Sequence, residues 1–159
     1  MYRAFVTFTA LLIAMTAASA GTIKPQSGWV VMDTPYPFLT LVNRLEAAVK
    51  AEHMSLVTAA SASEGAKTAG FQIPGNRVVG VFRNDFARRM LDASISAGIE
   101  APIRFYVTEN PDHTATLSYR KPTTVFAPYG EEGKDALKAV ANELDEIFER
   151  IAAQATKEK

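Results

Sequence analysis

The chain has 159 residues, of which 48% are hydrophobic and 21% charged, and it contains no cysteine. Its 17 basic residues balance its 17 acidic ones, whereas a nucleic-acid binder usually carries a clear basic excess. The sequence therefore predicts one folded domain without disulfides or thiolate chemistry, and it excludes nucleic acid as a partner.

The first twenty residues have the layout of a secretory signal peptide. Arg3 supplies a positive charge, the stretch 4–20 is uncharged and largely apolar, and its last three residues (Ala-Ser-Ala) form a small-x-small cleavage site. The apolar part is too short for a membrane span, which needs about 20 strongly apolar residues. We therefore expect cleavage between Ala20 and Gly21 and a periplasmic or secreted protein with no transmembrane segment after cleavage. An uncleaved N-terminal anchor is the alternative.

Cleavage would change both the length and the charge of the chain. Removal of residues 1–20 leaves 139 of the 159 residues. It removes Arg3 and no acidic residue, so 16 basic residues then face 17 acidic ones and the net charge becomes −1. Residues 21–28 form a short polar leader that we expect to be flexible, ahead of a single domain over residues 29–155.

The predicted domain begins with a strand, a turn and a helix. Residues 29–32 favour a strand, and two prolines within 33–37 favour a turn because proline resists both helices and central strands. An apolar stripe at helical spacing then predicts a helix that starts near Phe38. The stripe consists of Phe38, Leu41, Val42, Leu45 and Val49.

Two further strands enclose a short helix. Residues 54–58 and 77–82 favour strands, and Gly80 marks a bulge or a close contact in the second of these. Between them, Ser61 and Glu64 have the spacing of a helix capping box. The same pair would also suit a nucleophile and a base, but helix capping explains them without a third catalytic partner.

The second half of the domain is predicted to hold a helix, a hairpin and a long final helix. Asn84 is suited to cap a helix that runs to about Ala97 and buries Phe86 and Met90. Strands are predicted over 103–109 and 114–120, and residues 122–130 are predicted as a proline-containing loop. The final helix carries the longest apolar stripe: Leu137, Val140, Ala141, Leu144, Ile147, Phe148 and Ile151.

The hairpin loop 110–113 (Asn-Pro-Asp-His) decides which side chains share a face of the sheet. A plain four-residue loop would pair Val107 with Thr116, whereas a three-residue loop with a bulge at His113 pairs Val107 with Leu117. Only the bulged form gathers one apolar face: Ile103, Phe105, Val107, Ala115, Leu117 and Tyr119. His113 must then adopt a left-handed backbone, so it is interpreted as a turn residue, with a ligand or acid–base role as the alternative.

The same register predicts a polar face on the other side of the hairpin. Its members are Arg104, Tyr106, Thr108, Thr116, Ser118 and Arg120. Arg104 is placed opposite Arg120, and like charges in that position destabilise a sheet by up to about 1 kcal/mol. The plain interpretation is two arginines extended into solvent. The alternatives are compensation by a bound anion, by an acidic neighbour or by a dimer partner.

Elsewhere the sequence offers little chemistry. It has no nucleophile elbow, phosphate-binding loop, paired-histidine zinc motif or calcium loop, so we predict neither a metal nor a cofactor. Apart from His113, the one imidazole is His53, at the predicted end of the first helix, where the helix dipole favours a cation. No catalytic constellation emerges.

Three segments resemble the core of the domain-of-unknown-function 302 family. They are 75–84 (GNRVVGVFRN), 101–107 (APIRFYV) and 117–122 (LSYRKP), and the order of predicted elements matches over most of the chain after the signal peptide. The resemblance implies an α+β fold: a mainly antiparallel sheet with helices on one face, in two layers, similar to the arrangement of the TATA-binding protein. It also implies a domain that self-associates.

The resemblance implies no general enzymatic activity. Many members carry a histidine after the second strand, where this chain has 58–63 (TAASAS), and members often have glycine in the hairpin where this chain has His113. We expect a non-catalytic periplasmic binding or interaction module, dimeric, with Arg104, Tyr106, Arg120 and His113 as ligand or interface candidates.

The alternative function is an enzyme that acts on a small anionic metabolite. Arg104 and Arg120 would then anchor the substrate, and Tyr106 or His113 would donate a proton. A structural protein of the envelope is a third interpretation.

Overall fold

The computed structural model describes residues 23–158, so the predicted signal peptide and the first two residues of the leader lie outside the described residues. The strands are β1 (Trp29–Pro37), β2 (Ser55–Ala60), β3 (Asn76–Phe82), β4 (Ile103–Glu109) and β5 (Thr114–Arg120). The α-helices are α1 (Phe38–Ala51), α2 (Ala62–Thr68), α3 (Asn84–Ala93), α4 (Pro122–Phe126) and α5 (Gly130–Thr156). Two 3₁₀ turns, η1 (Ser96–Glu100) and η2 (Ala127–Tyr129), complete the elements.

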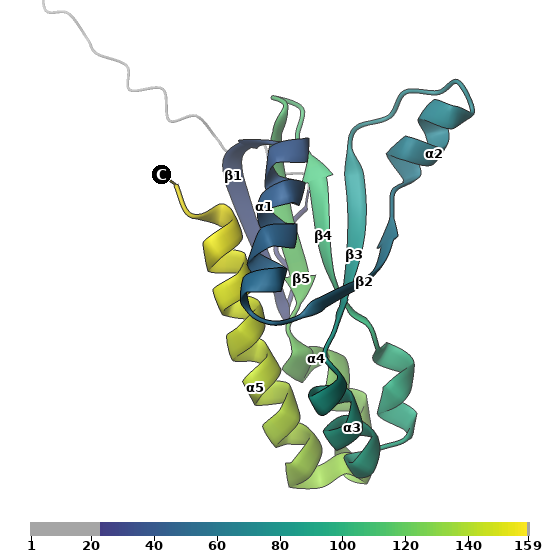
Figure 1. Cartoon of the computed structure of the whole chain (residues 1–159), viewed down its shortest axis with the longest axis vertical. Helices are drawn as coiled ribbons and strands as arrows, with labels where there is room; N and C mark the ends of the chain where they lie inside the picture. The colour runs from purple at the N-terminus through teal and green to yellow at the C-terminus, as the bar shows by residue number, and fades with distance from the viewer. Residues whose placement is uncertain (1–22, 159) are drawn as a thin grey trace, which may run out of the picture.

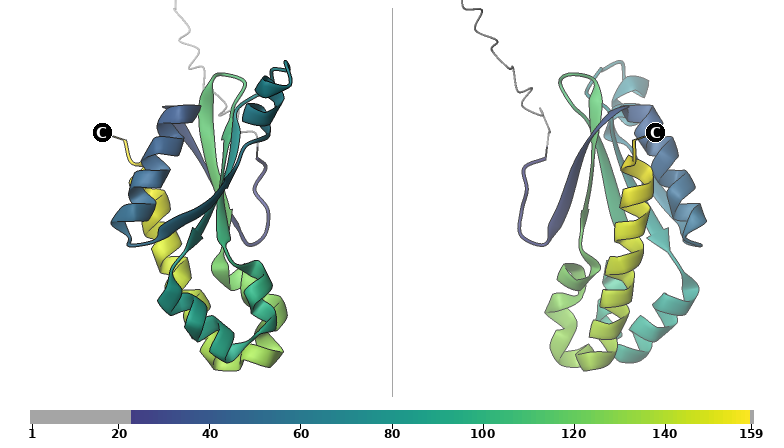
Figure 2. Two further views of the ribbon diagram at one scale, coloured as in Figure 1. Left: turned by 45° about the vertical axis from the view of Figure 1, so that its right-hand side comes forward. Right: turned by 90° about the vertical axis from the view of Figure 1, so that its left-hand side faces the viewer.

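The five strands form one antiparallel sheet in the order β1-β5-β4-β3-β2. Helices α1 and α5 cover one face of it, and α3 and α4 lie beyond its lower end (Figure 1). In the part of the chain that the structure describes, no helix lies on the opposite face (Figure 2). The prediction of a two-layer α+β fold is therefore confirmed.

The core lies between the sheet and the two long helices. Phe105 of β4 stacks on Phe148 of α5 with ring centroids 4.4 Å apart, and Tyr119 of β5 meets Phe105 edge-on at 5.1 Å. The predicted apolar stripes of α1 and α5 supply most of the remaining core. Every residue of the α5 stripe is buried, and so is every residue of the α1 stripe except Phe38. Helical periodicity thus identified the core side of both helices correctly.

The hairpin has the predicted bulged form. Phe105 pairs with Tyr119 and Val107 with Leu117, and His113 has a φ of 64°. The N–H of His113 donates to the carbonyl of Asn110 at 2.9 Å, which closes the turn. The pattern of apolar residues was therefore sufficient to fix the register of these two strands.

The predicted turn over 33–37 is wrong, because β1 continues through it to Pro37. β1 is an edge strand, and proline is tolerated at an edge, where the missing N–H has no partner strand to bond. A register shift between Thr34 and Pro37 accommodates the change in pairing. The two prolines thus shape an edge strand instead of ending it.

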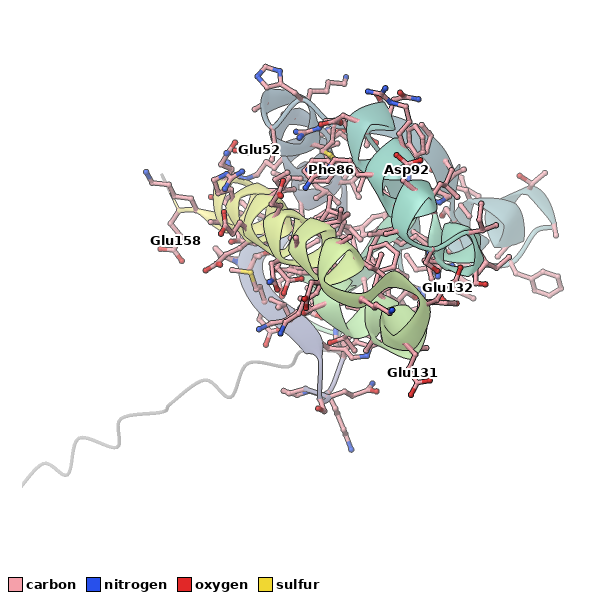
Figure 3. All side chains as sticks on the ribbon, turned by 90° about the horizontal axis from the view of Figure 1, so that it is seen from below. Glu52, Phe86, Asp92, Glu131, Glu132 and Glu158 are labelled. Carbon is pink, nitrogen blue, oxygen red and sulfur yellow. The ribbon has the colours of Figure 1, made fainter. Side chains whose placement is uncertain are left out.

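The helix predicted from Asn84 to Ala97 is shorter than expected. It begins at Asn84 itself and ends at Ala93, because Ser94 has an extended backbone and turns the chain into η1. The buried Oγ of Ser94 then accepts a hydrogen bond from the N–H of Ala97 at 3.1 Å. Figure 3 shows this end from below, where Glu132 of α5 lies beside η1 and accepts from the N–H of Ser96 at 3.5 Å.

The predicted loop over 122–130 is helical instead. Pro122 occupies the first turn of α4, where its fixed φ suits a helix and its missing N–H costs nothing. Asp145 of α5 accepts from both the N–H and the hydroxyl of Thr123, at 2.9 and 2.7 Å. A side chain 22 residues away therefore stabilises the start of this helix, which local pattern did not reveal.

Candidate functional site

The uncovered face of the sheet carries the predicted arginine pair. Trp29 pairs with Arg120, and Gly80 pairs with Arg104. Because Phe105 pairs with Tyr119, the register places Arg104 directly opposite Arg120. One row across four strands therefore runs Trp29, Arg120, Arg104 and Gly80.

The next row explains why this end of the face is hollow. Ser118 pairs with Val31 on one side and with Tyr106 on the other, and it has no exposed surface although no helix lies over it. Its small side chain lies between the larger ones of Val31 and Tyr106 and forms the floor of a depression. A hollow of about 220 Å³ results, and its lining includes Trp29, Val78, Arg104, Tyr106, Ser118 and Arg120.

The two arginines are exposed, and no acidic side chain among the described residues pairs with them. Within residues 23–158, neither Arg104 nor Arg120 forms an ion pair or a hydrogen bond through its guanidinium. By contrast, Arg77, Arg83 and Arg89 each contact a carboxylate. The hollow is therefore a locally cationic site with an indole and a phenol in its walls.

The opposite end of the same face is built differently. Thr116 lies 2.6 Å from an oxygen of Asp33 and 2.9 Å from Oδ1 of Asn110. Thr116 and Asn110 are buried, so these contacts satisfy polar groups that water does not reach. Asp33 is four residues from Trp29 along β1, and its bond to Thr116 belongs to this cluster and not to the arginines.

His113 does not join the other three candidates. It lies at the tip of the hairpin, exposed, with Nδ1 3.1 Å from Oε1 of Glu109. The backbone N–H of Gly75, which donates to Glu109 at 2.7 Å, and then His113 hold the pKa of the Glu109 carboxyl below its ordinary value. His113 borders a separate hollow of about 560 Å³ between the start of α1 and the loop after α2.

The residues that line this hollow and were not predicted for this face are Trp29, Val78, Ile103, Tyr119 and Val125. The sequence placed Ile103 and Tyr119 on the apolar face instead. Trp29 enters through the pairing of β1 with β5, and Val78 through the pairing of β3 with β4. Both pairings join strands that are distant in the sequence, so no local pattern revealed them. The one available signal was that Trp29 is the single tryptophan of the chain and lies at the start of a predicted strand.

The remaining titratable candidates have structural roles. His53 has a φ of 57° and ends α1, where its N–H donates to Lys50 and the N–H of Met54 donates to Val49. This is the hydrogen-bond pattern of a Schellman cap. Burial, followed by the charges of Glu149 and Asp145, raises the pKa of Tyr119 to about 12, so its phenol stays protonated.

The described residues form neither a metal-binding cluster nor a helix suited to cross a membrane. Residues 23–158 contain no group of three or more side chains placed to hold a metal ion. In that same range, none of the helices combines the length and apolarity that crossing a membrane requires.

Comparison with known proteins gave a family and a fold. Residues 30–154 match the model of DUF302, described as a domain of unknown function. A crystal structure of an uncharacterised conserved DUF302 protein from Bacillus stearothermophilus is similar, with a TM-score of 0.69 and 20% identity. The match covers 83% of this chain and 100% of that one. No curated protein matches the sequence.

Proposed function

The chain belongs to the DUF302 family, and from that premise we propose that it is an exported, non-catalytic binding module. Its ligand is a small anion, held by Arg104 and Arg120 in the hollow on the uncovered face of the sheet. The sequence supports the choice of the two arginines and the expected export, and the fold supplies the hollow.

The observation that carries this proposal is the unpaired state of the two arginines. Like charges at opposed positions destabilise a sheet, and the described part of the chain supplies no carboxylate to offset them. A bound anion relieves that repulsion and gains charge-assisted hydrogen bonds from both guanidinium groups. Binding an anion at this position therefore stabilises the folded protein.

The geometry gives less support to the enzymatic alternative. Of its two suggested proton donors, His113 lies at the hairpin tip and borders a different hollow. Tyr106 is the remaining donor, beside the arginines. Replacement of Tyr106 by Phe would abolish turnover of any substrate found for such an enzyme, whereas a binding module would retain its ligand.

The proposal is tested by thermal unfolding of purified residues 21–159 with and without anions. We expect inorganic phosphate or phenyl phosphate at millimolar concentration to raise the melting temperature of the unmodified protein. The increase should disappear in Arg104→Gln and in Arg120→Gln. Arg88→Gln is the matched control, because Arg88 is also exposed and forms no ion pair within the described range. Equal stabilisation in all four proteins, or in none, contradicts the proposal.

Export and oligomeric state are proposals that one further experiment tests. Native mass spectrometry of the protein taken from the periplasm of an expressing cell reports its mass. A protein that starts at Gly21 and carries a small retained ligand supports export and the binding module, and the mass of the assembly shows whether it is the expected dimer. A ligand-free dimer that buries the uncovered face would instead make that face an interface between two copies. A protein retained with residues 1–20 contradicts the predicted cleavage.

A further inference from the structure

We propose that the ligand of the arginine hollow is a phosphate monoester carried on a single flat ring. This inference deepens the proposed function and rests on it, because it names the chemical class of the anion. Three features of the hollow lead to it: its charge, its walls and its size.

The charge of the hollow favours a dianion. Arg104 and Arg120 come from facing positions on neighbouring strands, where side chains start about 5 Å apart. Two guanidinium groups that start so close are both within reach of one head group. A monoanion would leave one of the two charges uncompensated. The three terminal oxygens of a phosphate monoester accept hydrogen bonds from both guanidinium groups at once.

The walls favour a ring next to that head group. Trp29 lies beside Arg120 across the β1–β5 pair, and Tyr106 lies two residues from Arg104 on β4. Val78, opposite Tyr106, adds an apolar side chain. A bare inorganic anion would contact only the arginines, whereas a flat ring would also contact the indole and the phenol. Aromatic pairs contribute beyond their area when their rings stack or meet edge-on.

The size of the hollow favours a ligand with a single ring. The hollow has a volume of about 220 Å³. Pockets that enclose drug-sized ligands begin at about 300 Å³, so a nucleotide with its base, sugar and phosphate would extend beyond the walls. A phenyl-sized ring with one phosphate is of the right order.

The arrangement of charge along the face also orients the ligand. Asp33 lies four residues from Trp29 on β1, roughly 13 Å away at the usual rise of a strand. Its carboxylate faces the end of the sheet that holds Thr116 and Asn110. A phosphate is therefore drawn to the arginine end, and the ring lies over Ser118.

Isothermal titration calorimetry with four probes tests each feature separately. Phenyl phosphate has the proposed ring and dianion, benzenesulfonate has nearly the same shape with one charge, inorganic phosphate lacks the ring, and phthalate is a dicarboxylate. We expect phenyl phosphate to bind at least tenfold more tightly than each of the others at pH 7.5. Its affinity should fall below about pH 6, where the phosphate takes up a proton, while that of benzenesulfonate stays constant.

Variants assign the effects to residues. Arg104→Gln should bring phenyl phosphate and benzenesulfonate to similar affinity, and Trp29→Leu should bring phenyl phosphate and inorganic phosphate to similar affinity. Arg104→Lys, which keeps the charge, serves as a second variant if Arg104→Gln does not fold, and Arg88→Gln should change nothing.

The outcomes separate this inference from the proposed function. If benzenesulfonate or phthalate binds as tightly as phenyl phosphate through Arg104 and Arg120, the ligand class proposed here is wrong and the anion-binding function stands. Tighter binding of inorganic phosphate than of phenyl phosphate would show that the ligand needs no ring, and the anion-binding function would again stand. If no probe binds the unmodified protein, or if the arginine variants bind as it does, both proposals fail.

Discussion

A single arginine holds the end of the longest helix. Arg44 of α1 donates to three carbonyl groups at the end of α5: to Ala155 at 2.6 Å, to Gln154 at 3.2 Å and to Lys157 at 2.6 Å. Its guanidinium also lies 4.3 Å from the ring centre of Tyr36. The last carbonyls of a helix have no partner within it, so Arg44 satisfies groups that α5 leaves open, together with the hydroxyl of Tyr36, which donates to Lys157 at 2.7 Å.

Replacement of Arg44 by Met should lower the free energy of unfolding by about 1–3 kcal/mol. Methionine keeps much of the apolar stem but removes the charged hydrogen bonds to the helix end. Urea denaturation followed by circular dichroism measures the loss, and Lys50→Met on the same helix is the control. Equal stability of both variants would mean that the carbonyls of α5 are satisfied equally well by water.

Glu109 makes stability depend on pH on the acid side. Its carboxyl accepts from the N–H of Gly75 and contacts His113, and these interactions hold its pKa below the ordinary value of 4.5. A group with a lowered folded pKa contributes stability above its unfolded pKa and loses it as the pH falls through the folded pKa.

The melting temperature of Glu109→Gln should therefore fall less steeply below about pH 4.5 than that of the unmodified protein. Glutamine still accepts from Gly75 but cannot take up a proton in this range. Scanning calorimetry between pH 7 and pH 3 measures the slopes, with Glu146→Gln as an exposed control. Parallel curves for all three proteins would show that Glu109 does not carry this dependence.

At the scale of elements, the glycines of β3 and α2 affect stability in opposite ways. A Cβ at Gly80 would overlap Oγ1 of Thr58 on β2 and lie 2.8 Å from Cγ of Pro102. A Cβ at Gly65, in the exposed helix α2, would meet nothing within 4 Å. The first glycine permits close contact between strands, and the second only weakens a helix.

Gly80→Ala should destabilise the protein by about 1–3 kcal/mol, and Gly65→Ala should stabilise it by about 0.5–1 kcal/mol. Chemical denaturation of the two variants beside the unmodified protein measures both signs in one experiment. A neutral Gly80→Ala would mean that β2 moves away from β3 at little cost.

The elements that could be predicted from the sequence are those whose pattern is local. The bulged hairpin followed from which residues between 103 and 120 are apolar, and both of its strands have the predicted bounds. The extension of β1 and the helix at Pro122 were missed because proline excludes only interior positions. An edge strand and a helix first turn both accept it, and tertiary structure decides between them.

The candidate site was likewise predicted where its residues share a local pattern and missed where they come together only through the fold. Arg104, Tyr106 and Arg120 lie together because hairpin register alone places them on one face. Trp29 was missed because β1 reaches β5 from more than 80 residues away in the sequence. His113 was grouped with them by chemistry alone, and the structure places it at the other end of the hairpin.

At the scale of the molecule, stability is distributed unevenly across the sheet. Central strands β4 and β5 are flanked on both sides, and their core-facing residues are buried. Edge strand β2 is exposed at every position except the half-buried Leu56, and α2 buries no residue. The arm formed by β2 and α2 extends from the body in Figures 1 and 2.

Amide hydrogen exchange should follow this order. We expect the amides of β4 and β5 to exchange slowest, through global unfolding, and those of β2 and α2 fastest, through local opening. Mass spectrometry of peptic fragments from dilute protein measures both rates. Protection of β2 that rises with protein concentration would contradict an open edge and would indicate pairing with a second copy.

The left-handed turn at His113 has a consequence for how this protein tolerates insertions and deletions. Loss or gain of one residue in the loop 110–113 would shift β5 by one position against β4. The arginines of the two strands would then no longer face each other, although no residue of the hollow had been replaced. The length of the loop at the hairpin tip therefore determines whether the arginine site forms at the far end of the strands.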